Sequence, residues 1–392
     1  MDIGVNKKTL RRIAVFYIIV FSIYYYKLNP VMGIDKLAAL GLTVFGFFFL
    51  YFKVSKPFIL GSLILLIQYF SAIFYPESFR ISTFLYSAAL IFSFISVYTL
   101  VYDWHIFTNQ EFRRLIVGLM TAFFIVCIIQ QIFILIGVKV FPWINLIKYL
   151  DRSLGCNSLS YEPSSFARFM FVYYYAYIKC VEYDRGYPLS IKELFSSEYY
   201  KITSMFLWMM LTMGSGTAFV CLALLSLNFL NRSNWYYIVP VILCIFFVIL
   251  PMFQFEHANR AANIMTAMTT FDQGQVEAAD GSAASRISPL LNSFNADFSK
   301  KETWFGYGTD YAVRHQLFIK QTGTLFDDYG FLWYLATLAL SLSTAYGYSW
   351  ITIIYLFAGV AGGANGNINY AWGLMTIMSC VRYFYLNRKI LC

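Results

Sequence analysis

Charged residues are scarce in this sequence. Asp, Glu, Lys and Arg make up 12% of its 392 residues, whereas a soluble domain carries roughly 25%. A surface with so few charges cannot face water over most of its area, which excludes a soluble globular protein. The net charge of +9 arises largely from short basic clusters beside apolar stretches. Such clusters orient helices in a membrane, so we expect no nucleic-acid partner.

Residues that bind metals or form disulfides are also few. The three histidines stand apart, without Cys or Glu at the spacing of a zinc site. Of the seven cysteines, five lie in apolar stretches, one is the last residue and only Cys156 falls in a predicted loop. We therefore predict no disulfide framework and no metal site.

Nucleotide-binding and nucleophile motifs are missing as well. The sequence has no phosphate-binding loop, dinucleotide fingerprint, serine nucleophile elbow or Asp-x-Asp motif. The pair Gly306-x-Gly308 is too short to indicate a nucleotide site. An ATP-driven pump is excluded, and we predict that the protein uses no cofactor.

Apolar stretches fill most of the chain. Hydrophobic residues make up 59% of it, and the mean hydropathy is +0.61. We predict an all-α polytopic membrane protein, a single membrane domain over residues 1–392 with about 12 transmembrane helices. The predicted spans are 13–27, 36–52, 57–74, 82–101, 115–137, 166–181, 202–213, 217–230, 236–251, 327–345, 350–363 and 367–386.

Lysine and arginine give the predicted spans an orientation. The first span follows a basic segment with Lys7 and Arg11 and lacks a small-residue cleavage site, so we interpret it as a signal anchor. With the N-terminus in the cytoplasm, Lys and Arg of the short loops fall on the cytoplasmic side throughout. We expect a multi-pass protein of the bacterial inner membrane, with both termini in the cytoplasm and the lipid bilayer as its surroundings.

Two predicted spans depart from this regularity. At about 1.5 Å per residue, 202–213 and 217–230 are too short to cross about 30 Å of hydrocarbon. Small residues, Gly214-Ser215-Gly216, join them. The break is either a tight external turn between short helices or part of a re-entrant pair that lines a cavity.

Two predicted periplasmic loops concentrate the polar residues. The medium loop covers 138–165, and the long loop covers 252–326, far beyond the ordinary length of a connection. We expect the chemistry of the protein to lie here.

The end of the medium loop carries the first candidate residues. Glu162 precedes Pro163, which suits the first turn of a helix, so its carboxylate is either a capping group or a functional acid. Arg168 follows inside a predicted span, where a charged group either faces a cavity or extends to the headgroups.

Arginines supply the other candidates. Arg152 lies in the medium loop, and Arg286 and Arg314 lie in the long one. A guanidinium matches the oxygens of a phosphate, although each arginine has the alternative of an ordinary surface charge. His315 adds a titratable imidazole beside Arg314, with the alternative of an exposed pair.

The order of these motifs resembles a known family. The Glu-Pro-Ser motif, the Gly-Ser-Gly-Thr break, Ser285-Arg286-Ile287, the Trp-Phe-Gly-Tyr-Gly segment from Trp304 and the stretch Gly323 to Gly330 follow one another before a span. This order is similar to that of the Wzy-type O-antigen and capsular polysaccharide polymerases, which are related to the O-antigen ligases. The resemblance covers roughly residues 150–345.

Two departures from the family pattern concern possible site residues. Thr217 stands where an arginine often follows Gly-Ser in the family, and Thr324-Leu325-Phe326 stands where His-Asn is expected. His315, about nine residues earlier, either substitutes for that histidine or is unrelated to it.

The resemblance implies a membrane glycosyltransferase. It would transfer a growing glycan from undecaprenyl pyrophosphate to an incoming lipid-linked oligosaccharide repeat unit, without a metal and with inversion. Glu162 is the first candidate base and His315 the second, while Arg286, Arg314, Arg168 and Arg152 are expected to bind pyrophosphate. A chain-length regulator protein is a further partner that the family implies.

Two other functions fit parts of the pattern. An O-antigen ligase uses the same donor and a similar layout of loops. A lipid-linked oligosaccharide flippase or another transporter would have a similar number of spans, but such proteins tend to show related halves and charges near the middle of the membrane.

Overall fold

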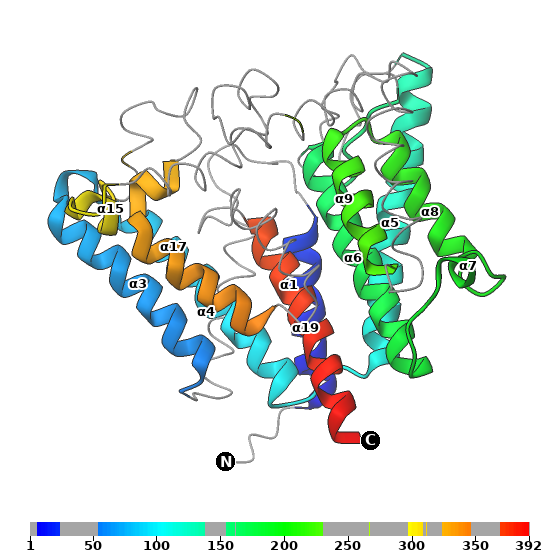
Figure 1. Ribbon diagram of the computed structural model, residues 1–392, viewed down its shortest axis with the longest axis horizontal. Coiled ribbons are helices and arrows are strands. Elements are labelled where there is room, and N and C mark those ends of the chain that lie inside the picture. The colour runs from blue at the N-terminus through cyan, green and yellow to red at the C-terminus, as the bar shows by residue number, and fades with distance from the viewer. Residues whose placement is uncertain are drawn as a thin grey trace. The chain divides into compact units, whose positions relative to one another are not determined.

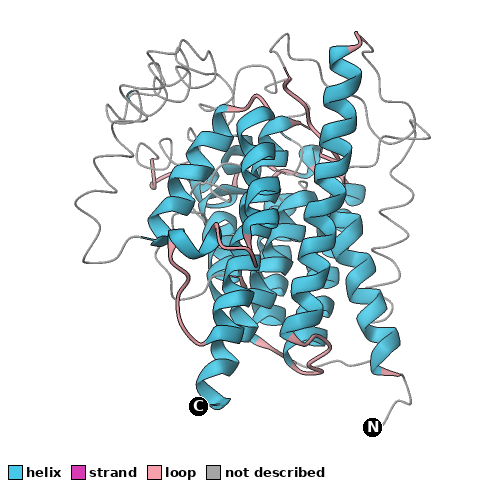
Figure 2. Ribbon diagram, turned by 90° about the vertical axis from the view of Figure 1, so that its right-hand side faces the viewer, coloured by secondary structure: helices cyan, strands magenta, loops and turns pink. Residues whose placement is uncertain are grey.

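The structure is a computed structural model that describes part of the chain. The described residues are 6–23, 54–137, 154–160, 162–229, 266, 297–308, 311, 324–345 and 369–391. Over these residues the chain forms helices and connecting loops, and no strand occurs in them (Figure 2). The prediction of an all-α protein is confirmed to this extent.

Within the described residues, three helices are long and apolar enough to cross a membrane. They are α3 (Lys56–Phe74), α4 (Ile81–Tyr102) and α5 (Asn109–Leu135). Their bounds match the predicted spans 57–74 and 82–101 closely, whereas α5 begins six residues before the predicted 115–137. The reason is a capping box, in which Thr108 and Glu111 satisfy each other's backbone N–H groups.

Other predicted spans overlap with helices of the structure, with bounds that differ by several residues in places. The helices in question are α1 (Lys7–Ser22), α6 (Pro163–Arg185), α8 (Tyr200–Thr212), α9 (Gly216–Ser226), α17 (Thr324–Thr344) and α19 (Asn369–Leu391). The predicted spans 36–52, 236–251 and 350–363 lie outside the described residues.

The chain divides into two compact units. Unit 1 contains α3, α4, α17 and the short helix α15 (Lys301–Phe305). Unit 2 contains α5, α6, α8, α9 and the single turn α7 (Ile191–Leu194). Helices α1 and α19 contribute residues to both units.

In unit 1, α3 packs against both α4 and α17, and α15 contacts α3 and α17 at one end (Figure 1). Gly61 permits the close crossing of α3 and α4, because a Cβ there would lie 2.6 Å from Ile91 Cγ2. The ring of Phe94 on α4 packs against Trp372 on α19, with 5.5 Å between the ring centroids.

In unit 2, α6 is buried on nearly all sides, and α5, α8 and α9 pack against it (Figure 1). Phe123 of α5 contacts the rings of Phe166, Phe169 and Tyr173 on α6. Tyr174 stacks on Phe206 of α8, with 4.1 Å between centroids. A helix without an exposed face is typical of the centre of a bundle.

Candidate functional site

The sequence around Glu162 starts α6 as predicted. Glu162 is the N-cap residue with an extended backbone (φ −150°), and Pro163 occupies the first turn. The Glu162 side chain makes no capping hydrogen bond. Instead, its carboxylate accepts a hydrogen bond from the hydroxyl of Ser164. Capping of backbone N–H groups therefore does not account for this carboxylate.

Arg168 lies less than two turns further along α6 and is buried. Its exposed fraction is 5%, and its neighbours Ala167 and Phe169 are buried as well. A side chain that extended to lipid headgroups would leave its guanidinium accessible at the surface of the bundle. The burial of Arg168 instead favours the alternative of a charge that faces the protein interior, which requires polar groups nearby.

A short polar segment lies against the neighbouring helix α5. Residues 154–160 lie against α5, where Ser158 N–H donates to Gln130 Oε1 (2.7 Å) and Gln130 Nε2 donates to the Ser158 carbonyl (3.2 Å). The Ser158 hydroxyl also donates to the carbonyl of Phe123 (2.6 Å). Ser158 has a φ of 48°, a left-handed conformation that these bonds hold in place.

Gln131 extends the polar contacts to α8. Its Nε2 donates to Thr212 Oγ1 (2.7 Å), and its Oε1 accepts from Trp208 Nε1 (3.0 Å). Thr212 is the last residue of α8, and α9 begins at Gly216 after Gly214 with a φ of 68°. The predicted break between two short helices is confirmed at this point.

These residues form a polar layer at one end of unit 2, where α5 and α8 end and α6 and α9 begin. The polar layer comprises Gln130, Gln131, Asn157, Ser158, Ser160, Ser165, Arg168 and Thr212. All but Thr212 are buried. The layer combines one permanent cation with many hydrogen-bonding groups, a composition suited to an anionic ligand.

The remaining predicted site residues lie outside the described part of the chain. These are Arg152, Arg286, Arg314 and His315. Glu162 and Arg168 are thus the two predicted residues that the structure brings to the same end of one helix.

Unit 1 has a second group of polar and aromatic residues, where α15 meets α3. The Tyr75 hydroxyl donates to Glu302 Oε1 (2.6 Å), and Lys301 Nζ lies 5.3 Å from the centre of the Tyr75 ring. The hydrogen bond from Tyr75 lowers the pKa of Glu302, helped by its backbone and by the nearby lysines. Burial, followed by the contact with Glu302, raises the pKa of Tyr75.

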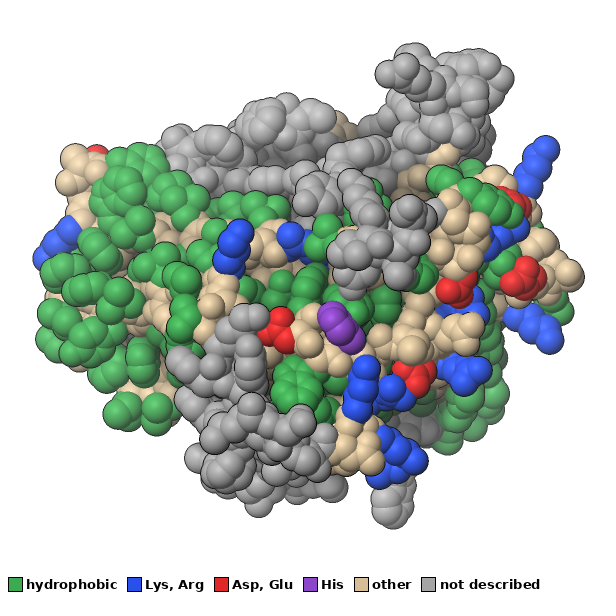
Figure 3. Space-filling model, turned by 90° about the horizontal axis from the view of Figure 1, so that it is seen from below, with side chains coloured by type: hydrophobic (Ala, Val, Ile, Leu, Met, Phe, Trp, Pro, Cys, Tyr) green, Lys and Arg blue, Asp and Glu red, His purple; other side chains and the backbone are tan. Residues whose placement is uncertain are grey.

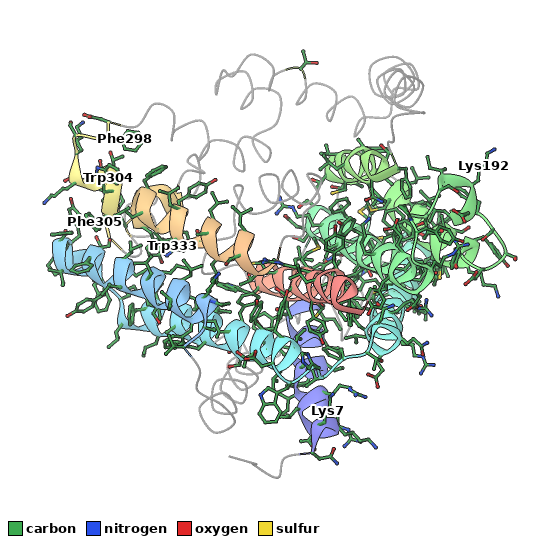
Figure 4. All side chains as sticks on the ribbon, turned by 60° about the horizontal axis from the view of Figure 1, so that its bottom comes forward. Lys7, Lys192, Phe298, Trp304, Phe305 and Trp333 are labelled. Carbon is green, nitrogen blue, oxygen red and sulfur yellow. The ribbon has the colours of Figure 1, made fainter. Side chains whose placement is uncertain are left out.

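Aromatic rings fill the other side of the same junction. Phe298, Trp304 and Phe331 contact one another in edge-to-face geometry, and Phe305 packs against Phe74 of α3 (Figure 4). The Trp-Phe-Gly-Tyr-Gly segment thus packs on helices of unit 1.

Three glycines bring the backbones at this junction into direct contact. A Cβ on Gly306 (φ 73°) would lie 2.3 Å from the Asp328 carbonyl oxygen, and one on Gly330 (φ 74°) would lie 2.5 Å from Gly306 N. Gly308 N–H donates to the same Asp328 carbonyl (3.2 Å). The Gly306-x-Gly308 pair therefore allows α15 to pack against the kinked start of α17.

Sequence reasoning missed the partners of these residues. The adjacent amides Gln130 and Gln131 in an otherwise apolar stretch were the available signal for the polar layer, because buried amides need partners. No comparable signal links Tyr75 to Glu302, which are 227 positions apart.

Comparison of the chain with protein-family models, curated proteins and solved structures finds no match. Among the described residues, no group of three His, Cys, Asp or Glu side chains is arranged to hold a metal ion.

Proposed function

We propose that this chain is a polytopic inner-membrane polymerase that transfers a growing glycan from undecaprenyl pyrophosphate to an incoming lipid-linked oligosaccharide. The observation that carries the proposal is the burial of Arg168 in the polar layer, on the same helix that Glu162 begins. A buried cation and a carboxylate at one end of a helix suit the transfer of a group from an anionic carrier. The order of motifs over residues 150–345, which resembles that of the polymerase family, favours lipid-linked glycans as the substrate class.

The distribution of cations supports a periplasmic position for the polar layer. Arg113 and Arg114 lie at the start of α5, Arg185 at the end of α6, and Lys192 and Lys201 on α7 and α8. These positions share the end of unit 2 opposite the polar layer. Figure 3 views the molecule from this side, with Lys and Arg in blue interspersed with Asp and Glu in red. Because cationic loops remain in the cytoplasm, the polar layer would face the periplasm.

Helices α3, α4 and α5 support the membrane location. In the proposed topology they belong to a set of about 12 spans, with the long periplasmic loop at 252–326 and both termini in the cytoplasm.

The proposed reaction is a displacement at the anomeric carbon of the donor glycan. The acceptor hydroxyl oxygen forms a bond to this carbon as the bond to the pyrophosphate oxygen breaks, and that oxygen keeps the electron pair. Attack from the opposite side inverts the anomeric configuration. Glu162 takes the proton of the acceptor hydroxyl, and His315 is the second candidate for this role.

Arginines stabilise the charge that the leaving pyrophosphate acquires. Arg168 contributes a guanidinium from within the bundle, and Arg152, Arg286 and Arg314 are the further anion contacts in this proposal. Guanidinium groups remain protonated at all working pH values and bind phosphate oxygens in pairs, so they stabilise this leaving group without a metal.

The proposal is tested on cell-surface glycolipid from a strain that lacks only this gene. Loss of polymerisation would collapse the ladder to lipid A–core carrying one repeat unit, and the wild-type gene would restore the ladder. If no repeat unit reached the core, the proposal of a polymerase would be refuted in favour of a ligase or a flippase.

Variants of Glu162 and Arg168 connect that phenotype to the site. Glu162→Gln and Arg168→Ala are expected to give the one-unit product at normal protein levels in the membrane. The matched controls Glu77→Gln and Lys192→Ala change exposed charges outside the polar layer and should leave the ladder intact. A normal ladder in both site variants would remove these residues from the mechanism.

A further inference from the structure

Two cysteines from separate segments of unit 2 lie side by side. The Sγ atoms of Cys127, on α5, and Cys156, in the segment 154–160, are 3.2 Å apart. Both residues have an exposed fraction of 0%. Both are free thiols in this structure. Sulfurs this close need to approach by roughly 1 Å to reach the bond length of a disulfide, about 2.0 Å.

Hydrogen bonds on both sides of Cys127 hold the two segments in this register. Ser158 donates to the carbonyl of Phe123, four residues before Cys127, and pairs with Gln130, three residues after it. Residues at these spacings share one face of a helix. The segment that carries Cys156 is therefore fixed along the same face of α5 that presents Cys127.

The local contacts of Cys156 also restrict its movement. Its neighbour Asn157 donates to the carbonyl of Ser160 (2.8 Å), which closes a turn immediately after the cysteine. Gln131 Nε2 lies 4.0 Å from Cys156 Sγ. Because the backbone that follows Cys156 is held, the contact between the sulfurs follows from the packing of this segment against α5.

We propose that Cys127 and Cys156 form a disulfide bond in the mature protein. The sequence alone predicts no disulfide, because the spacing of the cysteines shows no paired framework. Cys127 is within the last three turns of α5, at the end of unit 2 that holds the polar layer. In the proposed orientation that end faces the periplasm, where disulfides persist. The inference rests on that orientation and not on the proposed reaction.

The bond forms by exchange with a disulfide of the same compartment, either a protein oxidant or a small-molecule disulfide. The thiolate of one cysteine attacks the oxidant to give a mixed disulfide, and the second thiolate then displaces the oxidant sulfur. Two thiols lose two protons and two electrons in total, and the oxidant is reduced to two thiols. Since both sulfurs are buried in the folded protein, the exchange takes place before α5 and the segment 154–160 have packed.

The consequence is a covalent link between α5 and the residues that lead into α6. Cys156 precedes Glu162 by six positions. The disulfide would fix the start of α6 relative to α5, and it would resist reductants as long as the bundle remains folded.

The test counts thiols in the full-length protein purified from membranes of cells with a working periplasmic thiol oxidation system. The protein is denatured and alkylated with a mass-tagged maleimide, with and without prior reduction. Of its seven cysteines, five should react without reduction and all seven after it. Seven reactive thiols without reduction would overturn the proposal.

Single variants identify the pair. Cys127→Ser and Cys156→Ser each free the partner thiol, so the unreduced count should rise from five to six. The control Cys180→Ser, on α6, should lower it to four. If Cys127→Ser lowered the count instead, the bond would not involve Cys127.

Mass spectrometry of the unreduced wild-type protein gives an answer that does not depend on whether a variant folds. A peptide that joins Cys127 to Cys156 is expected, and a link from Cys156 to another cysteine would overturn the assignment. Neither readout depends on activity. If Cys127 and Cys156 were reduced in cells with a normal glycolipid ladder, only the disulfide proposal would be refuted. If the disulfide were intact but the protein failed the ladder test, only the polymerase proposal would be refuted.

Discussion

The hydroxyl of Tyr75 donates a 2.6 Å hydrogen bond to the carboxylate of Glu302 and so ties the end of α3 to α15, across 227 positions of the chain. This bond fixes the Trp-Phe-Gly-Tyr-Gly segment onto unit 1, together with the ring contacts of Phe305 and Phe74. Its strength depends on pH, because both partners titrate.

Acidification should weaken the hydrogen bond between Tyr75 and Glu302. The pKa of Glu302 is lowered in the folded protein, chiefly by the hydrogen bond from Tyr75, from an ordinary value of 4.5. Its contribution to stability is therefore complete above pH about 4.5 and is lost as the pH falls through the lowered folded pKa. Thermal unfolding of the detergent-solubilised protein should show a drop in this window. Tyr75→Phe should flatten that drop, and an unchanged profile would contradict the role of the bond.

For Tyr75 the dependence of folding stability on pH has the opposite sign, so stability should fall as the pH rises. Its pKa is raised in the folded state, first by burial and then by Glu302. The contribution of the neutral hydroxyl is complete below its unfolded pKa of about 10 and declines as the pH rises through the folded value. Glu302→Gln should diminish the alkaline loss of stability, measured by the same unfolding assay.

A methyl group at the junction of α15 and α17 should strongly destabilise the folded protein. Gly306→Ala places a Cβ 2.3 Å from the Asp328 carbonyl oxygen and also strains a backbone with a φ of 73°. We expect a loss of about 1–3 kcal/mol of stability for the backbone conformation alone, and more because the contact is with backbone.

The matched control is Gly118→Ala in the interior of α5, where a Cβ would meet nothing within 4 Å. This change should stabilise the protein by roughly 0.5–1 kcal/mol, because alanine favours a helix. Melting of both variants in one detergent measures the difference. Equal melting temperatures would show that the close approach at Gly306 does not contribute to stability.

Removal of the Gln130 amide should weaken the attachment of Ser158 to α5. Gln130→Leu deletes the donor and the acceptor of two hydrogen bonds to the Ser158 backbone, and loss of a buried hydrogen-bond partner costs about 1–3 kcal/mol. Limited proteolysis should then cut near residues 154–160 first. Gln110→Leu, at an exposed position in the first turn of α5, is the control and should retain the wild-type pattern.

Arg168→Lys should reduce polymer formation although it keeps the charge. A lysine lacks the planar fork that contacts two oxygens at once. Its ammonium is also more strongly hydrated in water than a guanidinium, so it costs more to bury. We expect a loss of roughly 10²–10³-fold in the rate of chain extension, the magnitude typical for one preorganised donor. The rate is measured with purified protein and lipid-linked repeat units, and a rate within about threefold of wild type would argue against direct contact with pyrophosphate.

Hydropathy predicted which stretches form helices better than it predicted the residue at which each helix begins. The apolar stretches behind α3 and α4 give their bounds almost to the residue, since both helices are apolar from end to end. The first two turns of α1 and α5 carry basic residues, which a search for apolar residues leaves out: Lys7, Lys8, Arg113 and Arg114. Helix starts depend on caps, and the pair Thr108 and Glu111 is such a signal.

The candidate site was predictable only where local chemistry determines it. Glu162 before Pro163 indicated the start of a helix, which the structure confirms. The sequence left open whether Arg168 would face lipid or protein, because that depends on helices that pack around α6. The contact of Cys127 with Cys156 depends in the same way on tertiary packing, which the number and spacing of the cysteines do not reveal.

The burial of α6 on nearly all sides has a consequence for how this protein changes over generations. Residues of α3 such as Ile59, Leu66 and Ile73 are exposed at the surface and can be exchanged for other apolar residues with little effect. Most positions of α6 are instead buried, so a change of volume there requires a matching change in a neighbour. Substitutions on this helix should therefore be inherited in compensating pairs, and the helix that carries Glu162 and Arg168 should diverge more slowly than the helices at the surface.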